Sequence, residues 1–261
     1  MNRKITCLQF DIAFGKPEEN FTKALQLIRE AAEDKPDIIV LPELWTTGYD
    51  LKRLDEIADE DGRETASFLA ELARKHSVSI VGGSVAKRTG NEVRNTLLAV
   101  SPEDGIIHEY SKLHLFRLMN EDHYLAPGSE KSLFTLKGVK SAGLICYDIR
   151  FPEWIRTHTT RGAQVLFIVA EWPLARLEHW RTLLLARAIE NQCFVVACNR
   201  SGSDPSNEFA GHSMIIDPWG EILAEAGKTE QSISASIQLD KVTEVRSQIP
   251  IFEDRRPSYY D

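Results

Sequence analysis

Residues 142–154 read AGLICYDIRFPEW, and this segment joins an apolar run to a proline through a single cysteine. A strand is expected over residues 139–146, and its apolar second half, residues 142–146, ends at Cys146. Pro152 suits the first turn of a helix, so a helix is expected over residues 152–161. A cysteine between a buried strand and a helix can lie in a sharp turn above a sheet. The segment therefore predicts a strand–turn–helix unit of an α/β protein.

The same alternation of strands and helices extends in both directions from this segment. Expected strands cover residues 5–10, 37–41, 78–82, 95–100, 106–110, 165–170, 194–199, 213–216 and 222–225, and expected helices cover residues 18–33, 64–76 and 177–192. Buried strands interleaved with helices and hairpins indicate a layered α/β protein with a mixed sheet. No repeat or linker interrupts the pattern, so we predict a single domain over residues 1–261. The irregular stretch 111–131 is of a length that often carries function.

Composition limits the functions that are open to the chain. Its 261 residues are 43% hydrophobic and carry a net charge of −8, which argues against a nucleic-acid-binding surface. The most apolar stretch, residues 165–170, is too short to span a bilayer, and the N-terminus lacks the pattern of a signal peptide. We therefore expect a cytoplasmic protein with reduced cysteines and no membrane partner. No cysteine or histidine spacing typical of a metal site occurs, so neither a metal nor a cofactor is expected.

Three residues could carry chemistry. Glu43 lies two residues beyond the strand expected at 37–41, where ligands gather in α/β sheets, and could act as a general base. Lys112 could stabilise an oxyanion. Cys146 could be a nucleophile whose pKa is lowered by a helix dipole and a nearby cation. Taken singly, each has an ordinary alternative as an exposed glutamate, a solvated lysine or a packed cysteine, and His114 leaves a Cys–His pair open.

Taken together, the segments around these residues resemble the nitrilase, or carbon–nitrogen hydrolase, superfamily. The likeness runs over nearly the whole chain, and the three catalytic blocks occur in the family's order. The matching segments are LPE at residues 41–43, YSKLHLF at 110–116, LICYDIRFPE at 144–153, RAIENQ at 187–192, and GHS at 211–213 with the turn DPWG at 217–220.

This resemblance implies an α/β fold built as a four-layer αββα sandwich with mixed sheets, often paired into homodimers. It also implies Cys146 as the nucleophile, Glu43 as the general base and Lys112 as the oxyanion stabiliser. The backbone N–H of Tyr147 would help to hold the oxyanion.

A second catalytic glutamate of the family lies in the loop after the lysine, shortly before a Pro-Gly pair. Glu121 precedes Pro127-Gly128 and matches that position, whereas Glu130 lies beyond the pair and matches less well. By this resemblance, Glu121 would orient Lys112 or assist proton transfer.

The closer likeness is to the bacterial branch of omega-amidases associated with methionine salvage, through AEWP at residues 170–173 and ACNRSGSD at residues 197–204. It implies a cysteine-dependent amidase that converts a short 2-oxo-acid amide, 2-oxoglutaramate or 2-oxosuccinamate, into the dicarboxylate and ammonia through a thioester. A substrate carboxylate would need a cation, and the arginines in or beside candidate site segments are Arg117, Arg150, Arg176 and Arg200. Tyr49 and Trp172 could form walls of the pocket.

Two other classes of function stay open. One is another hydrolase of the superfamily, such as an aliphatic amidase, a carbamoylase or a nitrilase. The other is a non-catalytic binding protein that retains the fold, although the presence of all three catalytic residues argues against it.

Overall fold

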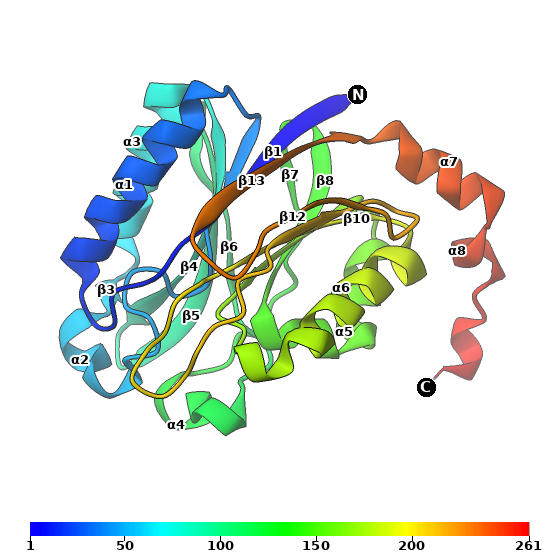
Figure 1. Cartoon of the computed structure of the whole chain (residues 1–261). Coiled ribbons are helices and arrows are strands. Elements are labelled where there is room, and N and C mark those ends of the chain that lie inside the picture. Colours follow the sequence, from blue (N-terminus) through cyan, green and yellow to red (C-terminus); the bar gives the residue numbers. More distant parts are fainter. Residues whose placement is uncertain (261) are drawn as a thin grey trace.

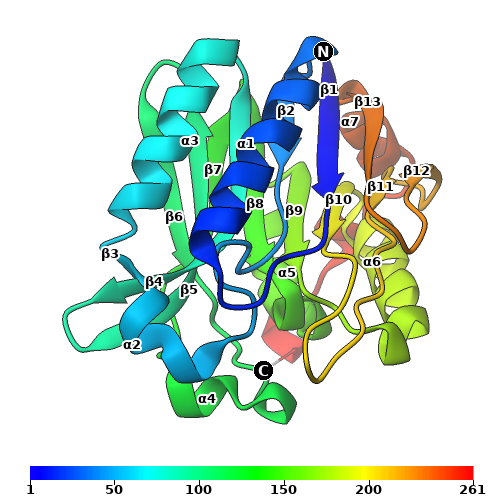
Figure 2. The same cartoon turned by 60° about the vertical axis from the view of Figure 1, so that its left-hand side comes forward.

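Two mixed β-sheets face each other at the centre of the computed structural model, which describes residues 1–260 (Figure 1). The first sheet has the order β13-β1-β2-β4-β5-β6, with short β3 beside β4, and the second has the order β12-β11-β10-β9-β8-β7. Helices α1 and α3 cover the outer face of the first sheet, and α5 and α6 that of the second (Figures 1 and 2). The predicted αββα sandwich with mixed sheets is confirmed.

The strands of the first sheet are β1 (Asn2–Gln9), β2 (Ile38–Val40), β3 (Asp59–Glu60), β4 (Ser79–Thr89), β5 (Glu92–Ser101), β6 (Gly105–Ser111) and β13 (Gln231–Gln238). Those of the second are β7 (Phe134–Leu136), β8 (Val139–Ile145), β9 (Val165–Ala170), β10 (Phe194–Asn199), β11 (Met214–Ile216) and β12 (Ile222–Glu225). The helices are α1 (Pro17–Glu33), α2 (Leu54–Ile57), α3 (Arg63–His76), α4 (Glu121–Tyr124), α5 (Pro152–Thr159), α6 (Leu177–Asn191), α7 (Asp240–Gln248) and α8 (Ile251–Asp254).

The centre of each sheet is parallel and is built from strand–helix–strand units. Strands β1, β2 and β4 are joined through α1 and α3, and strands β8, β9 and β10 through α5 and α6. Ligands of α/β proteins gather beyond the carboxyl ends of such strands. Glu43 follows β2, Cys146 follows β8 and Glu171 follows β9, so three chemically active side chains leave the sheets at these ends.

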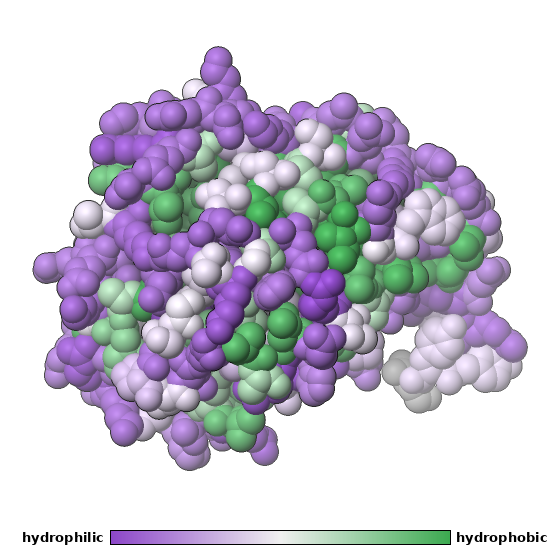
Figure 3. All heavy atoms as spheres, viewed as in Figure 1, coloured by the Kyte–Doolittle hydropathy of each residue, from purple (hydrophilic) through white to green (hydrophobic). Residues whose placement is uncertain are grey.

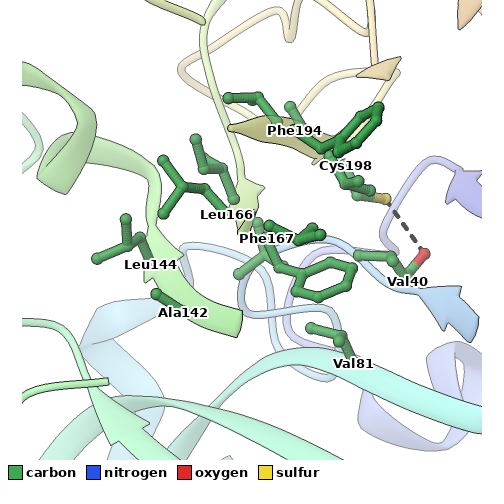
Figure 4. Close-up of a cluster of buried hydrophobic side chains, with 14 of the residues drawn as sticks. Val40, Val81, Ala142, Leu144, Leu166, Phe167, Phe194 and Cys198 are labelled. Atoms are coloured by element: carbon green, nitrogen blue, oxygen red, sulfur yellow. Dashed lines mark hydrogen bonds between the residues drawn. The ribbon is translucent and has the colours of Figure 1, made fainter. Parts of the chain in front are cut away.

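The main core lies between the two sheets. Ile38 and Val40 of β2 belong to this core, whereas Ile39 and Leu41 pack in the layer beneath α1 and α3. Burial on both faces explains why residues 38–41 form an unbroken apolar run rather than an alternating one. In Figure 4, Phe167 from β9 reaches across towards the facing sheet, and the Cys198 Sγ atom lies 3.4 Å from the Val40 carbonyl oxygen.

Strand β4 is longer than the sequence predicts. The prediction ends it at the pair Gly82-Gly83, but β4 continues to Thr89 with a register shift between Val81 and Ser84. Gly83 has φ +63°, and a Cβ atom there would lie 2.0 Å from the Pro42 carbonyl oxygen. The glycine pair is therefore a bulge, which lets β4 pass close to the turn that carries Glu43.

Seven elements were not predicted: the strands β3, β7 and β13 and the helices α2, α4, α7 and α8. Strand β13 reads QSISASIQ and pairs antiparallel with β1 at the edge of the first sheet. Its side chains are mostly small and polar, so its hydrophobic signal is weak. No helix within residues 1–260 is long and apolar enough to cross a membrane.

Candidate active site

Four side chains from separate segments form a buried hydrogen-bonded cluster. The Lys112 Nζ atom lies 2.9 Å from Glu43 Oε1 and 2.6 Å from Glu121 Oε1, and all three side chains have zero exposure. The Tyr49 hydroxyl donates to Glu121 Oε1 at 2.5 Å and also lies 3.2 Å from Glu43 Oε1. The structure thus brings Glu43, Lys112 and Glu121 together, with Tyr49 joining the two carboxylates.

The two carboxylates determine how the other members of the cluster ionise. Burial by itself lowers the pKa of Lys112, but Glu121 and Glu43 outweigh this and raise it well above its ordinary value. Burial raises the pKa of Glu121, while Lys112 holds it down and Glu43 pushes it up. Burial and the same two carboxylates raise the pKa of Tyr49. Lys112 is therefore an ammonium ion and Tyr49 a neutral hydrogen-bond donor at neutral pH.

Glu43 is fixed through both of its oxygens. Its Oε1 atom also accepts a hydrogen bond of 2.8 Å from the Asn95 side chain on β5, and its Oε2 atom accepts one of 2.8 Å from the backbone N–H of Glu171. Asn95 is buried within a strand and belongs to no sequence motif, so only the structure reveals its role.

Lys112 owes its position to the end of β6 and to the Pro-Gly pair that follows in sequence. Its backbone N–H donates to the Asn95 carbonyl oxygen at 2.8 Å, and its own carbonyl accepts from the N–H of Gly128 at 2.9 Å. A Cβ atom on Gly128 would lie 2.1 Å from the Ser111 carbonyl oxygen, so only glycine allows this approach. The spacing between Lys112 and Pro127-Gly128 therefore has a structural reason.

Cys146 begins a 3-10 turn, Cys146–Arg150, directly after β8 and has φ +45°. Positive φ is uncommon outside glycine, and it marks the predicted sharp turn. Asp148 in this turn accepts hydrogen bonds through Oδ2 from the Ile145 N–H at 3.0 Å and from the Tyr110 hydroxyl at 2.8 Å. Asp148 therefore holds the strained turn that presents Cys146.

His114 does not form the alternative pair with Cys146. Its Nδ1 atom lies 2.8 Å from Asp148 Oδ1, and its ring stacks on Phe151 with a centroid distance of 3.6 Å. The histidine thus supports the turn from the side.

The pKa of Cys146 moves in the opposite direction to that expected from sequence. Burial raises it well above its ordinary value, the negative charge of Glu43 raises it further, and Lys112 offsets only part of this. Desolvation and the adjacent carboxylate outweigh the helix dipole and the single cation. The thiol of Cys146 therefore keeps its proton at neutral pH.

Cys146 lies at a small cavity that contains two arginines. The cavity is lined by Phe116, Met119, Cys146, Tyr147, Arg150, Glu171, Trp172, Pro173 and Arg176. The Arg150 guanidinium stacks over Trp172 at 4.7 Å, and that of Arg176 stacks over Phe116 at 5.4 Å. Burial lowers the pKa of Arg150, and the positive charge of Arg176 adds to this effect. Neither arginine is paired with a carboxylate among residues 1–260, so no side-chain carboxylate balances their positive charges beside the cavity.

Other predicted site residues lie elsewhere. Arg117 is exposed on the short turn Arg117–Met119 and does not line the cavity, because its neighbours Phe116 and Met119 occupy the inner side. Glu130 is exposed. Arg200 is buried and pairs with Glu171 at 2.6 Å. Within the described residues, no cluster of three or more histidine, cysteine, aspartate or glutamate side chains is arranged to hold a metal ion.

Comparisons with known proteins give the chain clear relatives. Residues 4–247 match the family model described as carbon-nitrogen hydrolase. The chain is 60% identical over 260 residues to the 2-oxoglutaramate amidase of Bacillus subtilis (strain 168), covering 100% of both. It is 32% identical over 266 residues to the omega-amidase NIT2 of Homo sapiens, covering 98% of this chain and 96% of that one. The crystal structure of XC1258 from Xanthomonas campestris, a CN-hydrolase superfamily protein with an arsenic adduct in its active site, matches with a TM-score of 0.92 and 32% identity, covering 98% of each chain.

Proposed function

Because this chain belongs to the carbon–nitrogen hydrolase family, we propose that it hydrolyses the terminal amide of a short 2-oxo acid, 2-oxoglutaramate or 2-oxosuccinamate. The products are the dicarboxylate and ammonia. The observation that carries the proposal is the buried Glu43–Lys112–Glu121 cluster beside Cys146, at a cavity with two unpaired arginines. The 60% identity to a 2-oxoglutaramate amidase supports the choice of substrate.

The first half of the proposed reaction forms a thioester. Glu43 accepts the thiol proton of Cys146, whose raised pKa makes a base necessary, and the sulfur attacks the amide carbonyl. The Lys112 ammonium and the backbone N–H of Tyr147 hold the oxyanion. Glu43 then returns the proton to the nitrogen, and ammonia leaves. Glu121 accepts a hydrogen bond from Lys112 and thereby orients its ammonium group.

The second half of the reaction releases the acid. Glu43 takes a proton from a water molecule that attacks the thioester carbonyl, and the same oxyanion donors hold the second tetrahedral intermediate. Collapse of this intermediate expels the sulfur, and Glu43 returns the proton to the thiol. The cycle divides one difficult displacement into two easier ones and requires no further reactant.

The substrate carboxylate is assigned to the arginine side of the cavity. Arg150 lies four residues after the nucleophile and stacks over Trp172, which forms a wall. Arg176 supplies a second positive charge that lines the same cavity. Tyr49 takes a different role from the pocket wall expected from sequence, because its hydroxyl contacts Glu121 and Glu43. Arg117 has no part in this assignment.

We expect 2-oxoglutaramate to exceed glutamine in kcat/KM by at least about tenfold, which corresponds to roughly 1.4 kcal/mol. Glutamine carries an α-ammonium where the 2-oxo acid has a neutral carbonyl. Beside Arg150 and Arg176, that ammonium would lose its hydration and face like charges, which is unfavourable. Ammonia release from the two substrates under identical conditions measures the ratio.

The same assay separates the other functions if it includes a simple aliphatic amide, a nitrile and an N-carbamoyl compound. Equal rates on glutamine and 2-oxoglutaramate, or a clear preference for one of these three compounds, would overturn the substrate but leave the Cys146 chemistry standing. Absence of turnover on every compound would favour a binding protein.

We also expect a homodimer. Figure 3 shows hydrophobic side chains on the side of the molecule that carries the β12 hairpin and the C-terminal helices. Ile189 on α6 and Trp219 in the hairpin turn are 53% and 44% exposed. A Cβ atom on Gly220 would lie 2.6 Å from Ile189, so the turn and α6 form one continuous apolar surface. Light scattering should give the mass of two chains for the wild type and of one chain for Ile189→Asp. The control Leu118→Asp makes the same kind of change at an exposed site on another segment and should keep the mass of two chains.

The cytoplasmic location and the place in methionine salvage stay predictions of this proposed function. Each of the four cysteines is free, which suits a reducing compartment.

A further inference from the structure

Glu171 occupies an unusual place in the cavity. It follows β9, has zero exposure and lines the cavity together with Cys146. Its backbone N–H donates to Glu43 Oε2 at 2.8 Å, so it is a direct neighbour of the proposed base. Nothing in the mechanism above uses its side chain.

One oxygen of the Glu171 carboxylate is held firmly, and the other is not. The Oε2 atom lies 2.6 Å from Arg200 Nη1. Arg200 is itself fixed by Asp11 Oδ1 at 2.8 Å and by the Ile12 carbonyl oxygen at 2.9 Å. The Oε1 atom is buried and has no hydrogen-bond partner among residues 1–260. A buried carboxylate oxygen without a donor is unfavourable, and a ligand donor would relieve it.

We propose that Glu171 Oε1 accepts a hydrogen bond from the carboxamide N–H of the substrate. This inference rests on the proposed function. Of the groups in an ionised 2-oxo-acid amide, only the carboxamide carries a donor hydrogen. Its nitrogen must approach Glu43, which protonates it on departure, and Glu171 is hydrogen-bonded to Glu43 through its backbone.

Glu171 is therefore a specificity-determining residue. An ester presents an alkoxy oxygen, and a nitrile presents a nitrogen without hydrogen, at the place where an amide presents N–H. Both would leave Oε1 without a partner and bring a second acceptor towards it. Sites that are built to hydrogen-bond an N–H or O–H group reject analogues that lack it, because their own buried polar atom stays unpaired.

The pKa of Glu171 determines the pH at which the proposal is tested. Burial raises its pKa to about 8, with Arg200 opposing the rise and the charges of Glu43 and Asp204 adding to it. An N–H donor at Oε1 favours the charged form, so binding of the amide itself draws Glu171 towards ionisation. Assays at pH 9 start with the carboxylate ionised and ready to accept.

The decisive variant is Glu171→Gln, assayed on 2-oxoglutaramate and on the methyl ester in which OCH₃ replaces NH₂. In the wild type, Arg200 donates a hydrogen bond to Oε2 of Glu171. In the variant, the glutamine side-chain oxygen therefore takes the place of Oε2, and the side-chain NH₂ group takes the place of Oε1. The variant thus exchanges an acceptor for a donor with almost no change in size. We expect its ratio of amide to ester kcat/KM to fall at least about tenfold below that of the wild type. Glu208→Gln removes an exposed carboxylate and should leave the ratio unchanged.

Glu171→Met removes the carboxylate acceptor without adding a donor, and it should also lower the ratio of amide to ester kcat/KM. Retained ester hydrolysis would show that each variant is folded. An equal fall on amide and ester in both variants would make Glu171 a structural residue and overturn the proposal. A wild type inactive on 2-oxoglutaramate would instead refute the substrate, and the ratio would then be measured on whichever amide it does hydrolyse and the matching ester.

Discussion

Replacing Cys146 with alanine should abolish hydrolysis of every amide substrate, and the melting temperature should stay within about 4 °C of the wild type, the change expected for roughly 1 kcal/mol in a chain of this length. The reason is that, among residues 1–260, Cys146 is the only cysteine that lines the cavity. Cys7, Cys193 and Cys198 all have zero exposure, whereas Cys146 is 5% exposed and lines the cavity. Ammonia release and a thermal melt of the same preparation measure both quantities.

The matched controls are Cys193→Ala and Cys198→Ala. Both remove a thiol from the core, so they should lower stability and leave turnover per folded molecule unchanged. A small thiol-reactive probe followed by mass spectrometry should label Cys146 first in the wild type. Early labelling of Cys7 or Cys193 with Cys146 unmodified would contradict the assignment of the nucleophile.

Replacing Glu43 with glutamine should lower kcat by about 10²–10⁴, the usual contribution of a positioned acid–base group. Burial keeps the pKa of the Cys146 thiol high, so the sulfur cannot attack at neutral pH unless a base removes its proton. Glutamine has nearly the same volume as glutamate and cannot accept that proton. Rapid-quench kinetics should show that the variant lacks the fast first turnover of product that an acyl-enzyme produces.

Glu130→Gln is the control for this variant, because it makes the same change at an exposed position and should keep the wild-type kcat. The pH dependence adds a second check. Because the pKa of the thiol is raised, Glu43→Gln should regain rate only as alkaline pH ionises the sulfur directly. A normal first turnover at neutral pH would mean that another group is the base.

Much of the fold follows from the sequence because its central strands, such as β2, β9 and β10, are buried on both faces. Strands β9 and β10 have the predicted bounds, since each is built on an apolar run of at least five residues. The helix over α1 and the turn at residues 217–220 are likewise confirmed. The sequence predicts the catalytic residues from the order of the motifs that contain Glu43, Lys112 and Cys146. Each residue alone could equally be an exposed glutamate, a solvated lysine or a packed cysteine.

What the sequence could not provide are properties that depend on distant neighbours. The bulge at Gly82-Gly83 depends on the approach of Pro42, and the contact of Asn95 with Glu43 joins two strands. The sequence predicts a lowered pKa for Cys146, and this prediction is wrong. The desolvation that raises the pKa comes from the folded surroundings and cannot be read from local sequence. Arg117 and Arg176 look equivalent in the sequence, yet only Arg176 lines the cavity.

Because the site is divided between two sheets, it can form only late in the folding of the chain. Glu43 and Lys112 follow strands of the first sheet, whereas Cys146 and Glu171 follow strands of the second. A folding intermediate in which only one sheet has formed would hold either the proposed base and cation or the proposed nucleophile, but never all three. Enzyme activity therefore reports the docking of the two sheets rather than the formation of either, and a refolding experiment followed by turnover would time that last step.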